Sequence, residues 1–179
     1  ALARLGLAPA APQTTPADSA RTWRVAIVQT NEPQSNKERW TLETGAQALA
    51  RFLALTEQAA LHTPRPDIII WPETTLPGGP LNPEAVEAQR THRVVYTFDT
   101  ATLPPLLRAL LPPDARSDRL AATFFADALC ATQARLGIPM LVVAIAIDGL
   151  NVSAAPDGRV NFSHSARHNS ALLVSGGRV

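Results

Sequence analysis

One acidic residue occupies a position at which a carboxylate can act as a base. Glu73 lies in the stretch PDIIIWPETTLP (66–77), where it follows three isoleucines, Trp71 and Pro72. A carboxyl group at the end of so apolar a strand is partly withdrawn from water, and this raises its pKa. A raised pKa suits the group to take a proton from a nucleophile. Glu73 is therefore the candidate catalytic residue, and the alternative is a surface acid that follows a strand.

The other side chains with catalytic potential have more ordinary interpretations. Cys130 is the only cysteine, but it lies in FFADALCATQ, an amphipathic helical pattern in which small buried thiols are usually inert. Lys37, the only lysine, precedes a predicted helix, where a solvated cation is the usual role. We expect no metal and no cofactor, because the histidines lack the paired spacing of metal ligands. These histidines are His62, His92, His164 and His168.

Two stretches together resemble a known family. RVAIVQTNEPQSNKERW (24–40) and PDIIIWPETTLP are similar to the opening of the catalytic domain of the apolipoprotein N-acyltransferases. That family is a membrane-anchored branch of the nitrilase, or carbon–nitrogen hydrolase, superfamily. HNSALLVSGG (168–177) is similar to a later strand of the superfamily that contains an Asn–Ser pair. The likeness spans roughly residues 24 to 177, and its middle part matches only in outline.

The resemblance implies a fold and a set of site residues. The fold is an α/β protein of the nitrilase type, an αββα sandwich, which we expect to be incomplete in this chain. The site is a Glu–Lys–Cys triad, of which only Glu73 maps here, so we expect the chain alone to be inactive. Trp40 corresponds to a family tryptophan, about two residues later than usual, and either lines the acyl pocket or anchors a helix.

The resemblance also implies substrates and a location. An acyl chain passes from a phospholipid to the enzyme's cysteine and then to the N-terminal cysteine of a lipoprotein. The parent protein is expected at the periplasmic face of the bacterial inner membrane, with membrane contact through segments missing from this chain. We read the chain as a piece of a longer protein, because it begins with Ala1 and stops at Val179 before the family's lysine and cysteine motifs.

Composition bounds the remaining possibilities. A chain of 179 residues fits one domain, which we expect over residues 23–179 after a flexible lead-in or linker at 1–22. A net charge of +1 gives no field that attracts nucleic acid, so we expect no nucleic-acid partner. No apolar run reaches the length that crosses a bilayer, and the fragment itself is expected to be soluble.

The order of predicted elements favours a sheet covered by helices. Continuous apolar runs predict buried strands at 23–30, 67–73, 138–148 and 168–179, the first of them buried on both faces. Helical spacing predicts helices at 37–61, 82–98 and 117–137, the last capped by Ser117 or Asp118. Residues 76–113 are interpreted as an insertion over the sheet edge.

Two other functions stay open at this point. A soluble nitrilase-like amidase shares the triad but hydrolyses small amides, and the TNEPQS and WPETTLP phrases favour the acyltransferase over it. A catalytically dead binding or scaffold domain is the non-enzymatic alternative. Transmembrane segments upstream in the gene would support the acyltransferase, and a stop codon directly after Val179 would support the scaffold.

Overall fold

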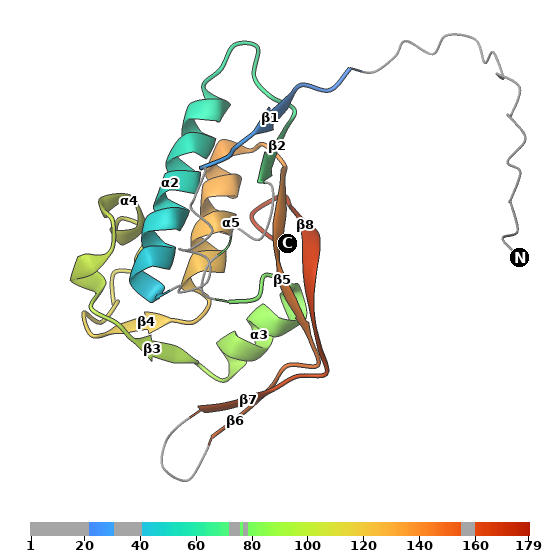
Figure 1. Ribbon diagram of the computed structural model, residues 1–179. Helices are drawn as coiled ribbons and strands as arrows, with labels where there is room; N and C mark the ends of the chain where they lie inside the picture. The colour runs from blue at the N-terminus through green and yellow to red at the C-terminus, as the bar shows by residue number, and fades with distance from the viewer. Residues whose placement is uncertain (1–21, 31–40, 72–75, 77–78, 155–159) are drawn as a thin grey trace, which may run out of the picture.

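A four-stranded mixed sheet organises the fold (Figure 1). The structure is a computed structural model that describes residues 22–30, 41–71, 76, 79–154 and 160–179. The strands, in their order across the sheet, are β1 (Val25–Ile27), β2 (Ile68–Trp71), β5 (Met140–Asp148) and β8 (Ala166–Val174). β1, β2 and β5 run parallel, and β8 is antiparallel to β5. The expected α/β class is confirmed, and each of these four strands lies within or overlaps a predicted one.

Two long helices pack on one face of this sheet, which we call the covered face (Figure 1). They are α2 (Leu42–Ala60) and α5 (Phe124–Leu136). α2 begins at a capping box, in which the Thr41 hydroxyl accepts from the Thr44 amide and the Thr44 hydroxyl accepts from the Thr41 amide. α5 ends at Gly137, whose φ of 66° is the left-handed conformation that closes many helices.

The strand register shows which side chains meet these helices. Alternate residues of β2 and β5 point to the covered face and are fully buried; they are Ile69, Trp71, Met140, Val142 and Ala144. The last turns of α5 are joined to the end of β8 by Gln133. Its side-chain amide donates to the Ile138 carbonyl at 3.1 Å and accepts from the Gly177 amide at 2.7 Å. The covered face is therefore closed at this end by hydrogen bonds as well as by packing.

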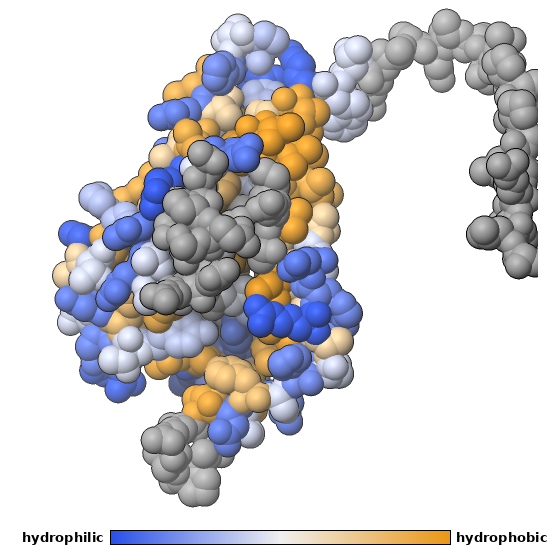
Figure 2. All heavy atoms as spheres, viewed as in Figure 1, coloured by the Kyte–Doolittle hydropathy of each residue, from blue (hydrophilic) through white to orange (hydrophobic). Residues whose placement is uncertain are grey.

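The opposite face of the sheet, which we call the open face, is apolar but uncovered by any described helix or strand (Figure 1). Besides Asn169 and Arg167 of β8, the register places ten aliphatic residues on it: Val25, Ile27, Ile68, Ile70, Leu141, Val143, Ile145, Ile147, Ala171 and Leu173. Ile27 is 67% exposed and Leu173 is 54% exposed. Figure 2 shows apolar surface along the side on which β1 and β5 lie. The expectation that the first strand is buried on both faces is thus wrong for the described residues.

The predicted insertion hydrogen-bonds to the interior strand β5 through Leu81 and Asn82. The Leu81 amide donates to the Ile145 carbonyl at 3.0 Å, and the Asn82 side chain bonds both the amide and the carbonyl of Ile147. The insertion contains α3 (Pro83–Thr91), β3 (Val95–Thr97), the 3-10 helix η1 (Thr100–Thr102) and α4 (Pro105–Arg108). It therefore continues the hydrogen bonding of β5 beyond the end of β2.

Two predicted helix boundaries are wrong. The helix expected at 82–98 stops at Thr91, because Arg93 takes a φ of 50° and the β-branched residues after it form β3. The helix expected from Ser117 or Asp118 begins instead at Phe124. The carbonyls of Ser117 and Asp118 accept hydrogen bonds from Thr100 and Phe98, and this pairing precedes β4 (Arg119–Ala121).

A two-stranded hairpin connects β5 with β8. It consists of β6 (Asn151–Ala154) and β7 (Val160–Ser163), and it projects from the body of the molecule (Figure 1). These two strands were not among those predicted from the sequence. Among the described residues, no helix is both long and apolar enough to cross a membrane.

Candidate functional site

Trp71, the described residue nearest in sequence to the candidate base, belongs to a buried hydrogen-bonded group at the end of β2. The Trp71 indole donates to the Thr56 hydroxyl at 2.8 Å, and that hydroxyl donates to the Phe52 carbonyl at 2.8 Å. The Trp71 and Phe52 ring centroids are 4.9 Å apart. Trp71 and Thr56 are both 0% exposed. The last described residue of β2 is therefore attached to α2 by both a directional bond and ring packing.

The helix accounts for the position of the acceptor. Phe52 and Thr56 are four residues apart on α2, so they lie one above the other on the face that meets the sheet. A threonine in a helix can donate to the carbonyl four residues earlier, and Thr56 does so. Its oxygen then remains available to accept from Trp71, so every polar group of the pair has a partner.

Both site residues predicted from the sequence lie outside the described residues. Glu73 falls in the segment 72–75, and Trp40, like Lys37, falls in the segment 31–40. The chain itself limits where Glu73 can be, since only Pro72 separates it from Trp71. The structure describes the strand that precedes Glu73 in the sequence and leaves Glu73 itself a prediction.

An acidic cleft of about 490 Å³ lies beside the first turn of α2. It is lined by Glu43, Thr97, Phe98, Asp99, Ser117 and Asp118. Two of its carboxylates already have partners within the protein. Asp99 accepts from the Ala101 amide, and the hydrogen bond from Arg116 lowers the pKa of Asp118. The Asp99 and Asp118 carboxylates of this cleft are therefore already hydrogen-bonded within the protein.

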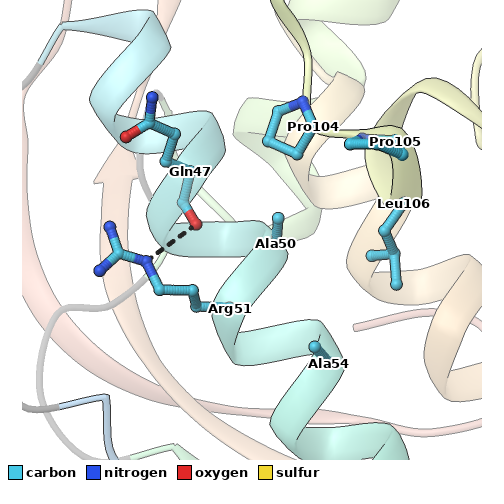
Figure 3. Close-up of a pocket in the computed structure, with 7 residues that line it drawn as sticks. All are labelled: Gln47, Ala50, Arg51, Ala54, Pro104, Pro105 and Leu106. Atoms are coloured by element: carbon cyan, nitrogen blue, oxygen red, sulfur yellow. Dashed lines mark hydrogen bonds between the residues drawn. The ribbon is translucent and has the colours of Figure 1, made fainter.

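A second, mostly apolar groove of about 570 Å³ lies between α2 and α4 (Figure 3). It is lined by Gln47, Ala50, Arg51, Ala54, Pro104, Pro105 and Leu106. The α2 residues of this groove recur at helical spacing on the side of the helix opposite Phe52 and Thr56. The groove is therefore separated from the end of β2 by the thickness of α2.

Cys130 lacks the surroundings of a nucleophile. Burial raises the pKa of its thiol, Asp127 raises this pKa further, and Arg90 only partly opposes the change. A nucleophilic cysteine needs the reverse, a pKa lowered by nearby positive charge or a base. The structure gives Cys130 the environment of a packing residue on α5.

The histidines of the described segments do not assemble a metal site. His168 lies 3.0 Å from a carboxylate oxygen of Asp148, in an exposed pair across β5 and β8. No cluster of three or more metal-ligating side chains occurs within the described part of the chain.

No family model matches the chain, and no curated protein or solved structure matches it either. The function is therefore proposed from the residues and their packing.

Sequence reasoning missed Thr56, although one signal was present. Thr56 is a polar residue on the apolar stripe of α2, one turn after Phe52, where a hydroxyl needs a partner.

Proposed function

We propose that this chain is the first part of the catalytic domain of an apolipoprotein N-acyltransferase, with Glu73 as its general base. One observation carries the proposal: β2 lies between the parallel strands β1 and β5 and leads directly into Pro72 and Glu73. Ligands of such sheets bind at the carboxyl ends of the strands. Glu73 follows the central parallel strand, at the edge where a substrate is expected.

The finer architecture, an αββα sandwich, is part of the same proposal. The open face supports it, because an aliphatic sheet face of this size is unfavourable in water and matches the inner face of a sandwich. A second sheet packed on the open face completes the four layers. Helices α2 and α5 then form one outer layer.

The proposed reaction has two half-reactions that share one base. Glu73 takes the proton of a cysteine encoded outside these 179 residues, and the thiolate attacks the acyl carbonyl of a phospholipid. A lysine stabilises the oxyanion, the ester C–O bond breaks, and the lysophospholipid takes the proton from Glu73. The amino group of a lipoprotein then attacks the thioester, the C–S bond breaks, and Glu73 carries a proton from the amine to the sulfur.

The test compares acyl-enzyme formation in matched variants of the gene-encoded protein that contains this chain. With a labelled phospholipid as donor, Glu73→Gln should slow labelling by about 10²-fold or more, the usual contribution of a general base. Glu87→Gln is the control, because Glu87 is an exposed acid that pairs with Arg90 on α3. Equal labelling of Glu73→Gln and wild type would remove Glu73 from the mechanism and favour the binding or scaffold interpretation. Release of free fatty acid without transfer to the amine would favour a hydrolase.

A further inference from the structure

We propose that the outer edge of β8 is a docking site for one further strand, and that the segment encoded directly after Val179 occupies it. The outer edge consists of the backbone groups of β8 that point away from β5. The inference rests on the proposed function only in requiring that the gene continues beyond Val179. It adds a strand to the sheet and fixes the direction and the register of that strand.

The hydrogen bonds of β5 establish the direction in which its backbone groups point. The Ile147 amide and carbonyl bond the Asn82 side chain, and the Ile145 carbonyl accepts from the Leu81 amide. Ile145 and Ile147 therefore point away from β8. In an antiparallel pair, residues opposite each other either bond each other or both point outward, and the two cases alternate along the strands.

This alternation assigns the outer edge to every second residue of β8. Arg167 lies opposite Ile147, so its amide and carbonyl point outward, as do those of Ala171 and Leu173. Because β8 is the last strand of the sheet, no described strand bonds these groups (Figure 1). β8 pairs with β5 over nine residues without a bulge and contains no proline. It thus lacks two of the features that keep many edge strands from accepting a partner.

The turn after β8 already starts a strand on this edge. Ser175 belongs to the same outward-pointing set; its amide donates to the Arg178 carbonyl at 2.8 Å, and the Arg178 amide donates back at 3.3 Å. Between them, Gly176 and Gly177 have φ values of 60° and 76°, the pattern of a type I′ hairpin turn. The Gln133 side chain accepts from the Gly177 amide at 2.7 Å and holds the turn against α5. The chain is therefore directed back along the outer edge, antiparallel to β8.

The pair formed by Ser175 and Arg178 also fixes the register of the docked strand. The same register puts Val179 opposite Val174, and both of these side chains pack in the main core. The first residue encoded after Val179 then falls opposite Leu173, and every second residue after it bonds the outer edge.

The direction of the docked strand has a consequence for the sheet as a whole. A strand antiparallel to β8 runs parallel to β1, β2 and β5, so its carboxyl end lies at the sheet edge where β2 ends. Trp71, Val142 and Leu172 are level across the sheet, and the second residue encoded after Val179 continues this row. The residues that follow are carried to the edge at which ligands of such sheets bind.

The experiment measures amide hydrogen exchange, residue by residue, in the gene-encoded protein and in the 179-residue chain. In the gene-encoded protein, the outward amides of Arg167, Ala171 and Leu173 should exchange as slowly as the inward amides of Ser170 and Leu172, which point to β5. In the 179-residue chain, the outward amides should exchange about 10²-fold faster, or more, than the inward ones. The inward amides are the matched control, because they lie on the same strand and open with it.

Two substitutions at Gly176 test whether the turn directs the pairing. Among the described residues, no atom lies within 4 Å of a Cβ added at Gly176, so neither substitution changes the packing of the turn. Gly176→Val strains the left-handed conformation and should speed exchange of the outward amides in the gene-encoded protein by about 10-fold or more. Gly176→Asn gives an Asn–Gly turn, a favoured type I′ pair, and should leave their exchange unchanged.

Several results would overturn the inference. Fast exchange of the outward amides in the gene-encoded protein would mean that the edge is unpaired, and a gene that stops at Val179 would leave no segment to occupy it. Protection in the 179-residue chain that rises with protein concentration would identify a second copy as the occupant. Unchanged protection in Gly176→Val would show that the turn does not direct the strand. Failure of the proposed function is distinct: full acyl-enzyme labelling of Glu73→Gln beside a protected edge would reject the function and leave the docked strand in place.

Discussion

The two faces of the sheet are made by the same strands, yet their environments differ. On β5, Val142 is fully buried against the helices, whereas its neighbour Val143 points to the open face and is partly exposed. On β8, Val174 is fully buried and Leu173 is 54% exposed. Alternation of side chains along a strand produces this difference directly.

The contrast shows that an apolar face of a sheet need not be covered by another element. Both faces are largely apolar, but the helices in the described part of the chain cover only one of them. An aliphatic face without a cover is typical of a surface that another layer occupies. The open face is therefore consistent with the proposed sandwich. Matched substitutions on the covered and open faces test this comparison most directly.

The largest expected effect comes from placing a charge on the open face. Val143→Lys should lower the unfolding free energy of the gene-encoded protein by about 3 kcal/mol or more, since a covering sheet would bury the ammonium group. In the 179-residue chain the same change should stay within about 1 kcal/mol, because the side chain is partly exposed there. Urea unfolding of both proteins measures the difference. Equal effects in the two would mean that nothing covers this face.

The next effect compares the two faces at adjacent positions. Val142→Ala should destabilise the 179-residue chain by about 2–3 kcal/mol, through lost apolar burial and a cavity against the helices. Val143→Ala, the matched change on the open face, should cost less than about 1 kcal/mol. Chemical denaturation of both variants checks this, and similar losses would contradict the assignment of covered and open faces.

A smaller effect is expected at the closed end of the covered face. Gln133→Leu leaves the Gly177 amide and the Ile138 carbonyl without their buried partner, which should cost about 1–3 kcal/mol. Gln58→Leu is the control, because Gln58 is exposed on α2. Thermal unfolding and amide exchange at Gly177 give the readout. Unchanged exchange at Gly177 would show that Gln133 does not hold the end of β8.

The smallest effect concerns the reactivity of Cys130 on the covered side. Its raised pKa means that less thiolate is present at a given pH, so iodoacetamide should label the folded protein more slowly than the protein in urea. The labelling rate of the folded protein should continue to rise above about pH 8.5, the ordinary thiol value. A rate that levels off below about pH 7 would indicate an activated thiol and reopen Cys130 as a nucleophile.

The sequence predicted most of the sheet and the long helices, because their signals are local. Apolar runs marked β2 and β5, and helical spacing marked α2. β3 and β4 were missed, since strands of three residues carry little pattern and pair only in the folded chain. Coverage of a face was also beyond the sequence, because an apolar run does not show which element packs on it.

The candidate site was predictable only in part. Glu73 could be singled out from the residues before it, but it lies outside the described residues and stays a prediction. The bond between Thr56 and Trp71 joins residues fifteen positions apart, across a helix and a strand. The sequence could mark Thr56 as a polar residue on the apolar stripe of α2, but its partner depends on tertiary packing and could not be predicted.

The ribbon formed by β5, β6, β7 and β8 has a consequence for the order of folding. β6 pairs with β7, and this hairpin lies between β5 and β8 in the sequence. Once the hairpin has formed, β5 and β8 are already close together, so their pairing has only a small loop-closure entropy cost. β1 and β2 must instead meet across 43 residues, from Val25 to Ile68. We therefore expect the ribbon to assemble early and the parallel pair late, with φ-values for Ala substitutions higher at Val152 than at Ile69. The reverse ranking would mean that the crossover helix, and not the ribbon, nucleates the chain.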